Sequence, residues 1–195
     1  MSEGIGWLRR LRWLLAAAAL AGLVALVAVA ILALAGDWTR LDVPVDRVGG
    51  VRAGDPLPAG VQVAGDGTVQ LQVPDPGWGQ RLLSLAMSVP EIFVQVAVLW
   101  LAARLVGDAA GGAAFADHTA GAVRRLAAWC AVGGSVAVVI QEVATSALSA
   151  TVLPSGWLPP VPLPVAWLVA GLVLAALSQV IARGSALRAE LDEVV

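Results

Sequence analysis

The chain has 195 residues, of which 59% are hydrophobic and 13% are charged. A soluble domain usually carries about twice that charged fraction, because water must wet its surface. The formal net charge of -2 argues against a nucleic-acid partner, which would require a concentrated basic surface. The single cysteine excludes a disulfide within the chain. The composition therefore indicates an integral membrane protein whose main partner is the lipid bilayer.

Four long apolar segments predict four transmembrane helices, at residues 13–35, 82–106, 126–153 and 165–181. The first has no charged residue, and its ~22 residues reach about 33 Å, enough to cross a hydrocarbon core of about 30 Å. Ala33-Leu34-Ala35 offers a signal-peptidase site, but the apolar region of a signal peptide has only about 7–15 residues. We therefore expect an uncleaved anchor. Pro90 lacks a backbone donor and is expected to kink the second helix.

The distribution of arginine predicts that both termini lie in the cytoplasm. The segments expected inside carry Arg9, Arg10, Arg12, Arg104, Arg124, Arg125, Arg183 and Arg188. The segments expected outside carry Arg40, Arg47, Arg52 and Arg81, diluted by Asp37, Asp42, Asp46, Asp55, Asp66 and Asp75. Most tryptophans agree, because Trp7, Trp13 and Trp129 fall near the inner interface and Trp38, Trp78, Trp157 and Trp167 near the outer one. Trp100 is the exception, because it lies within the second span.

Residues 37–80 form a polar segment that is expected outside. Apolar residues alternate with glutamine at 61–63 and 69–73, around the turn residues Gly65-Asp66-Gly67, and this predicts a β-hairpin. Residues 41–45 are expected to add an edge strand, where Pro44 is tolerated. About 40 residues cannot build an independent core. We therefore expect a small extracytoplasmic β-hairpin cap that rests on the outer ends of the helices.

Two segments are expected in the cytoplasm, the loop 107–125 and the tail 182–195. Small residues from Gly107 to Ala114 are interpreted as a linker, and Asp117 or Thr119 is expected to cap a helix that enters the third span. The tail is expected to continue the last helix. A solvated surface is the simpler interpretation of both segments. The alternative is a docking surface for a soluble regulatory protein, with the candidate residues Arg124, Arg125, Arg183 and Arg188.

Two stretches resemble a bacterial membrane-protein family, domain of unknown function family 2975. The clearer stretch is Leu177–Leu191, where the last helix continues into Arg-Gly, then Leu-Arg, then an acidic residue. The other is Phe115 followed by Val123-Arg124-Arg125-Leu126; here Ala114 precedes the phenylalanine where the family has proline, and the loop has no asparagine. The resemblance covers about the last 85 residues. It implies four spans with an outer loop after the first, no assigned activity, and at most a regulatory partner of the helix-turn-helix class.

Four polar residues inside the spans form a candidate intramembrane site: Glu91, Gln95, Gln141 and Glu142. Glu91 and Gln95 share a helix face because they are four residues apart. Glu91 and Glu142 are each about 12–13 Å from the outer ends of their helices, so their carboxyl groups could meet at one depth. A charge near the bilayer centre costs about 2.5–3.5 kcal/mol. We favour a protonated Glu–Gln clamp between helices, and an ion- or proton-linked site is the alternative.

Other candidate chemistry is weak. Asp117-His118 could form an acid–base pair, but no second histidine completes a metal site and no nucleophile motif accompanies it, so a solvated loop is expected. Small residues at four-residue spacing favour close helix packing, at Ala131/Ser135, Ala166/Ala170 and Gly171/Ala175. We predict no catalytic residue, no cofactor-binding residue and no metal ligand.

The predicted fold class is an all-α membrane protein, a four-helix transmembrane bundle with a small β-hairpin cap between the first two helices. The predicted function is a non-enzymatic regulatory or interaction component of the bacterial plasma membrane. A small transporter or channel subunit that uses Glu91 and Glu142, acting as a homo-oligomer, is the alternative.

Overall fold

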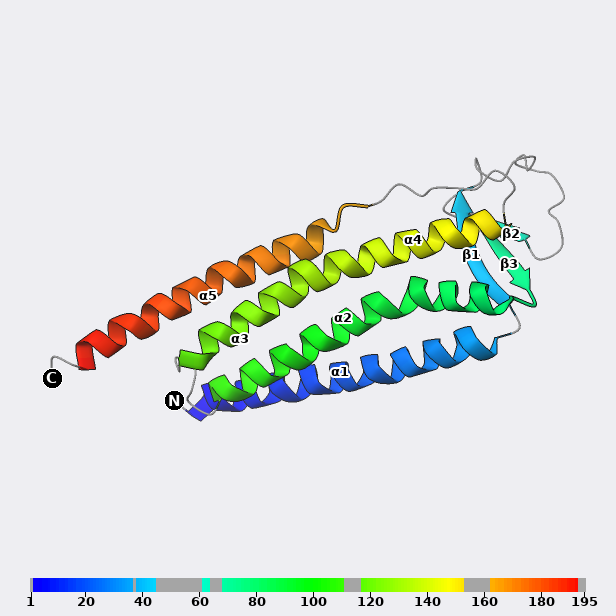
Figure 1. Ribbon diagram of the computed structural model, residues 1–195. Helices are drawn as coiled ribbons and strands as arrows, with labels where there is room; N and C mark the ends of the chain where they lie inside the picture. The colour runs from blue at the N-terminus through cyan, green and yellow to red at the C-terminus, as the bar shows by residue number, and fades with distance from the viewer. Residues whose placement is uncertain are drawn as a thin grey trace. The chain divides into compact units, whose positions relative to one another are not determined.

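The computed structural model describes residues 2–36, 38–44, 61–63, 68–110, 117–152 and 162–192 (Figure 1). The described helices are α1 (Ser2–Ala35), α2 (Trp78–Ala110), α3 (Asp117–Ala128), α4 (Gly134–Val152) and α5 (Val165–Asp192). A π-helical turn, η2 (Trp129–Gly133), joins α3 to α4. The described strands are β1 (Trp38–Pro44), β2 (Val61–Val63) and β3 (Thr68–Pro74).

Four helical stretches in the described residues are long and apolar enough to cross a membrane: Gly6–Ala35, Trp78–Ala110, Thr119–Thr151 and Val165–Ser185. Many large apolar side chains on these stretches are exposed, for example Leu172 at 71% and Leu14 at 65%. In water such a surface would cause aggregation, whereas acyl chains match it. The chain is therefore a multi-pass membrane protein, and its helices fit a four-helix membrane bundle.

Helices extend further than the sequence analysis expected at the segment between the second and third spans. α2 continues to Ala110, so the first part of the expected linker is helical, and α3 begins at Asp117, one of the two positions expected to cap it. His118, which was expected in a loop, lies in the first turn of α3. The physical reason is that alanine is a strong helix former and one interior glycine costs only about 1 kcal/mol. α2 also runs through Pro90 as one helix, and the expected kink stays a prediction.

Contacts divide the chain into two compact units, which are described separately. The first unit comprises Met1–Leu26, Glu91–Val138 and Leu163–Val195, and the second comprises Val27–Pro90 and Val139–Pro162.

Small residues allow α5 to pack closely on α3 and η2 in the first unit. A Cβ placed on Gly171 would lie 2.6 Å from the Cβ of Ala131 and 2.9 Å from the carbonyl oxygen of Ala127. The Trp167 ring likewise occupies the space where Gly134 lacks a side chain. Such small residues let two helix backbones approach in a membrane, where apolar burial does not drive association. The prediction of close packing at Gly171 is therefore confirmed.

The π-helical turn η2 lies in the same packed region. The backbone N–H of Gly134 points at the carbonyl oxygens of Trp129, Cys130 and Ala131 together. A π turn inserts one residue into an α-helix, and such insertions are frequent at functional sites. Trp129 packs over Gly133 and makes an edge-to-face contact with Phe93 of α2, with ring centroids 6.2 Å apart. This aromatic pair connects α2 to η2.

The second unit contains a three-stranded antiparallel sheet with the order β1-β3-β2. Leu41 and Val61 both pair with Leu71, and Val43 and Val63 both pair with Val69. Apolar residues thus lie opposite apolar residues across all three strands, which follows from the period-two alternation in the sequence. β1 is an edge strand that begins earlier than expected, and Pro44 is its last residue. The location of this sheet outside the membrane, as a cap, stays a prediction.

Hydrogen bonds within the second unit stabilise the start of α2. The Gly77 N–H donates to the Gln80 side-chain oxygen at 3.0 Å, which is half of a capping box. Arg81 donates through Nε to the Pro76 carbonyl at 3.1 Å and through Nη1 to the Leu34 carbonyl near the end of α1. Asp75, between β3 and α2, has a φ of 49°, a conformation that aspartate adopts more readily than most residues.

Candidate functional site

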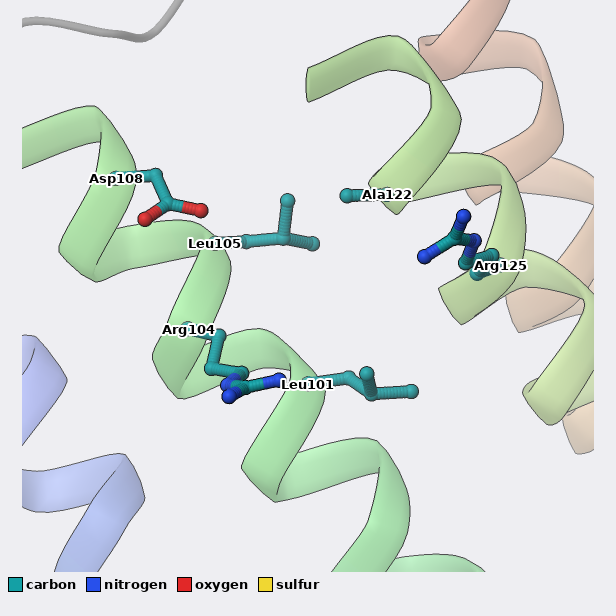
Figure 2. A pocket seen from close by; sticks show the side chains of 6 residues that line it. All are labelled: Leu101, Arg104, Leu105, Asp108, Ala122 and Arg125. Atoms are coloured by element: carbon teal, nitrogen blue, oxygen red, sulfur yellow. The ribbon is translucent and has the colours of Figure 1, made fainter. Parts of the chain in front are cut away.

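Two adjoining cavities in the first unit are lined by arginines from three helices. The first, which we name the α2–α3 cavity, has a volume of about 300 Å³. Its lining residues are Leu101, Arg104, Leu105 and Asp108 of α2 and Ala122 and Arg125 of α3. The α2 residues follow the spacing i, i+3, i+4, i+7, which places them on one helix face. Figure 2 shows the Asp108 carboxylate and the Arg125 guanidinium on opposite walls of this cavity.

The second, which we name the α1–α2 cavity, has a volume of about 210 Å³. Its lining residues are Arg12, Trp13 and Ala16 of α1 and Trp100, Ala103 and Arg104 of α2. Arg104 belongs to both cavities. Among the described residues that line the two cavities, Asp108 is the acidic one, and it lines the α2–α3 cavity alone. The α1–α2 cavity therefore has two guanidinium groups and no carboxylate in its described lining.

Two of these arginines are exposed, and each packs against a residue of α2. The Arg104 guanidinium carbon lies 5.9 Å from the centroid of the Trp100 ring, a cation–π arrangement. Arg12 lies along the α2 backbone at Gly107, since a Cβ at Gly107 would be only 3.1 Å from the Arg12 Nε. Glycine at this position leaves the room that the arginine side chain fills. The guanidinium groups of Arg12 and Arg104 are thereby positioned on α2.

An apolar groove adjoins the α1–α2 cavity. Its volume is about 280 Å³, and its lining residues are Ala16, Ala19, Leu20 and Leu23 of α1 and Val96 and Trp100 of α2. The α1 residues again follow the spacing i, i+3, i+4, i+7. Ala16 and Trp100 line both the groove and the α1–α2 cavity, so the basic cavity and the apolar groove share a wall. Close approach of α1 and α2 is allowed here by Gly22, where a Cβ would be 2.7 Å from a Val96 methyl group.

Residues 56–195 match the family described as "Protein of unknown function (DUF2975)". The chain belongs to this family. The match is longer than the 85 residues from which the resemblance was inferred, and it includes β2, β3 and the whole of α2. No curated protein and no solved structure matches the chain.

The candidate intramembrane residues of this DUF2975 protein are divided between its two units. In the first unit, the Gln95 side-chain amide donates to Glu91 Oε1 at 3.4 Å, a contact within α2. In the second unit, the backbone carbonyl oxygen of Gln141 accepts a hydrogen bond from the Thr145 hydroxyl at 2.8 Å. The backbone carbonyl oxygen of Glu142 accepts one from the Ser146 hydroxyl at 2.9 Å. The clamp and the ion-linked site both stay predictions.

The candidate docking arginines are distributed along α3 and α5. Arg124, Arg125 and Arg183 are exposed, and Arg188 lies in α5 at a position whose side chain is outside the described part of the chain. Of these residues, Arg125 lines the α2–α3 cavity. The DUF2975 chain thus places one predicted docking residue in a cavity, together with residues that were not predicted as site residues.

Arg12, Arg104 and Asp108 were not predicted as site residues, although both arginines were predicted at the inner boundary. A usable signal was the spacing of Leu101, Arg104, Leu105 and Asp108, which is a mixed polar and apolar helix face at the end of a span. Trp100 was the one tryptophan that did not fit the interfacial pattern. Its contact with Arg104 shows why it is there.

In the part of the chain that the structure describes, no group of three histidine, cysteine or acidic side chains is placed to hold a metal ion. The side chains of Asp117 and His118 lie outside the described set, so their role as a pair stays untested. Cys130, the single cysteine of this DUF2975 protein, is buried in η2 with 3% of its surface exposed.

Proposed function

We propose that this DUF2975 protein is a non-enzymatic interaction component of the bacterial plasma membrane that docks a soluble cytoplasmic protein at the α2–α3 cavity. The observation that supports this best is the composition of the cavity. Arg104 and Arg125 exceed Asp108 by one positive charge, and Leu101 and Leu105 add apolar surface. This combination suits a partner that inserts an acidic side chain next to an apolar one, because charge complementarity gives specificity and apolar contact adds affinity.

The topology that we propose places this cavity in the cytoplasm. Arg12 of α1, Arg104 of α2 and Arg125 of α3 line the two adjoining cavities, and arginine near the ends of spans favours the cytoplasmic side. The N-terminus and the C-terminus would then both be inside, and the β1-β3-β2 sheet outside. In this arrangement the protein would link an outer sheet to an inner docking site.

The test is site-specific photo-crosslinking in living cells. A photoreactive residue is placed at Ala122, which lines the cavity, in the full-length protein. We expect an adduct with one cytoplasmic protein, and loss of that adduct in Arg125→Glu, which inverts a lining charge. Arg124→Glu is the matched control, because Arg124 is exposed on the same helix and is not among the residues that line the cavity.

The outcomes separate the interpretations. A specific adduct that survives Arg124→Glu and disappears in Arg125→Glu supports the proposal, provided that the purified partner also binds the purified membrane protein. If the only adduct forms with a second copy of the chain, the cavity is an interface between copies of this protein and not a docking site for a soluble protein. Equal loss with both substitutions would mean that general surface charge, and not the cavity, attracts the protein.

A further inference from the structure

We propose that the α1–α2 cavity and the apolar groove beside it form a binding site for one anionic glycerophospholipid. The lipid phosphate would lie between Arg12 and Arg104, and one acyl chain would lie in the groove between Leu20, Leu23 and Val96. This proposal concerns a different cavity from the partner site and does not depend on it.

The charge of the α1–α2 cavity selects an anionic ligand. Arg12 and Arg104 come from two different helices and both line it, and no acidic residue occurs in its described lining. A guanidinium group binds phosphate oxygens through paired N–H donors, so two of them suit one phosphodiester. The neighbouring α2–α3 cavity contains Asp108, which partly compensates its arginines. The electrostatic difference between the two cavities therefore favours the α1–α2 cavity as the phosphate site.

Each arginine of this site is exposed and also contacts α2. An arginine that only follows the positive-inside pattern extends its side chain toward water. Arg12 instead lies against Gly107 of α2, and Arg104 lies over the Trp100 ring. Both side chains are exposed, so a ligand can reach them, and their contacts with α2 reduce the conformational entropy that is lost when a ligand binds. These contacts distinguish the site from ordinary interfacial arginines.

The apolar groove selects a ligand with an acyl chain. It shares Ala16 and Trp100 with the basic cavity, so polar and apolar surfaces meet at one wall. Trp13 also lines the basic cavity, and tryptophan near the end of a span favours the level of the headgroups. A soluble phosphate compound has no acyl chain to fill the apolar groove. Basic pockets between transmembrane helices are known to bind anionic headgroups.

The experiment measures lipid binding to the purified full-length protein in detergent by native mass spectrometry. Phosphatidylglycerol is compared with phosphatidylethanolamine, which has matched acyl chains and no net charge. We expect phosphatidylglycerol to bind about tenfold more tightly, a difference of about 1.4 kcal/mol. The double variant Arg12→Gln, Arg104→Gln is expected to lose this preference. The matched control is Arg9→Gln, Arg10→Gln, which removes the same charge from exposed positions that do not line the cavity.

A second variant keeps every charge. Gly107→Leu places a side chain in the space that Arg12 occupies and is expected to weaken phosphatidylglycerol binding. Gly184→Leu is its control, because a Cβ at Gly184 would meet nothing within 4 Å. Inorganic phosphate and sn-glycerol 3-phosphate are added as competitors to separate a lipid from a free phosphate.

The results that would overturn the proposal are specific. Equal affinity for the two lipids would show that the cavity does not recognise an anionic headgroup. Equal loss in the Arg9, Arg10 control would show that net charge alone attracts the lipid. Displacement of the lipid by inorganic phosphate at equal concentration would assign the cavity to a soluble anion. Gly107→Leu binding that matches both the parent and Gly184→Leu would show that the position of Arg12 does not matter.

Discussion

Arg81, near the start of α2, donates from Nη1 to the carbonyl oxygen of Leu34 near the end of α1. The last carbonyl groups of a helix have no partner within that helix, and the negative end of the helix dipole favours a cation there. The same guanidinium donates to the Pro76 carbonyl through Nε. One side chain therefore connects the end of α1, the turn before α2 and α2 itself.

The first prediction concerns this connection. Arg81→Gln is expected to destabilise the folded protein by about 1.5–3 kcal/mol, because charged hydrogen bonds to two carbonyl groups are lost. Arg81→Lys, which keeps the charge but has no planar fork of donors, is expected to fall between the parent and Arg81→Gln. Thermal unfolding in detergent measures the order of stability of the parent, Arg81→Lys and Arg81→Gln. Equal stability of all three proteins would show that the contact contributes nothing.

The second prediction concerns the packing of α5 on α3 and η2. Gly171→Ala is expected to destabilise the protein by about 1–3 kcal/mol, because the added Cβ meets the backbone at Ala127 and cannot be relieved by a rotamer change. Gly184→Ala on the same helix is the control, since its Cβ meets nothing within 4 Å. Reversible unfolding in mixed micelles would show the difference, and a Gly171→Ala protein as stable as the control would contradict it.

The third prediction concerns topology. Cys130 is the single cysteine, so in a Cys130→Ser background an added cysteine is the only thiol that can be labelled. In intact cells a membrane-impermeant maleimide is expected to label Gly77→Cys and to leave Gly6→Cys and Gly184→Cys unlabelled until the membrane is opened. All three positions have room for the side chain. The opposite labelling pattern would invert the proposed orientation.

The fourth prediction separates an interaction protein from a transporter. In liposomes with a pH gradient, the purified protein is expected to conduct no more protons than empty liposomes. Glu91→Gln is expected to be as stable as the parent, because the Gln95 amide can still donate to an amide oxygen at position 91. Proton flux in the parent that Glu91→Gln and Glu142→Gln abolish, and that Asp108→Asn leaves intact, would favour the transporter instead.

Sequence reasoning located the four membrane helices well, because uninterrupted apolar length is dictated by the bilayer. It placed the helix ends poorly where glycine and alanine dominate, since these residues are compatible with both a linker and a helix, as Gly107 to Ala110 shows. The four-residue spacing also marked Gly171 and Ala131 as positions for close packing, but it did not show that they face each other.

The candidate cavities could not be predicted from the sequence in the same way. The sequence identifies the arginines that lie at one side of the membrane, but it does not show which of them converge. That depends on how α1, α2 and α3 are rotated about their axes, and Arg12 lies against α2 where Gly107 leaves room for its side chain. The π turn also has no clear sequence signal, because Trp129–Gly133 has the composition of an ordinary apolar helix.

The extra residue in η2 changes how mutations along the third span must be planned. An α-helix turns by about 100° per residue, so one inserted residue rotates the helix that follows Gly133 in the first unit by about that angle relative to α3. A helical wheel drawn continuously over α3 and the start of α4 would therefore misplace residues 134–138 by about that angle relative to Val123 and Leu126. Scanning mutagenesis of this span should use two wheels, one ending at Ala128 and one starting at Gly134.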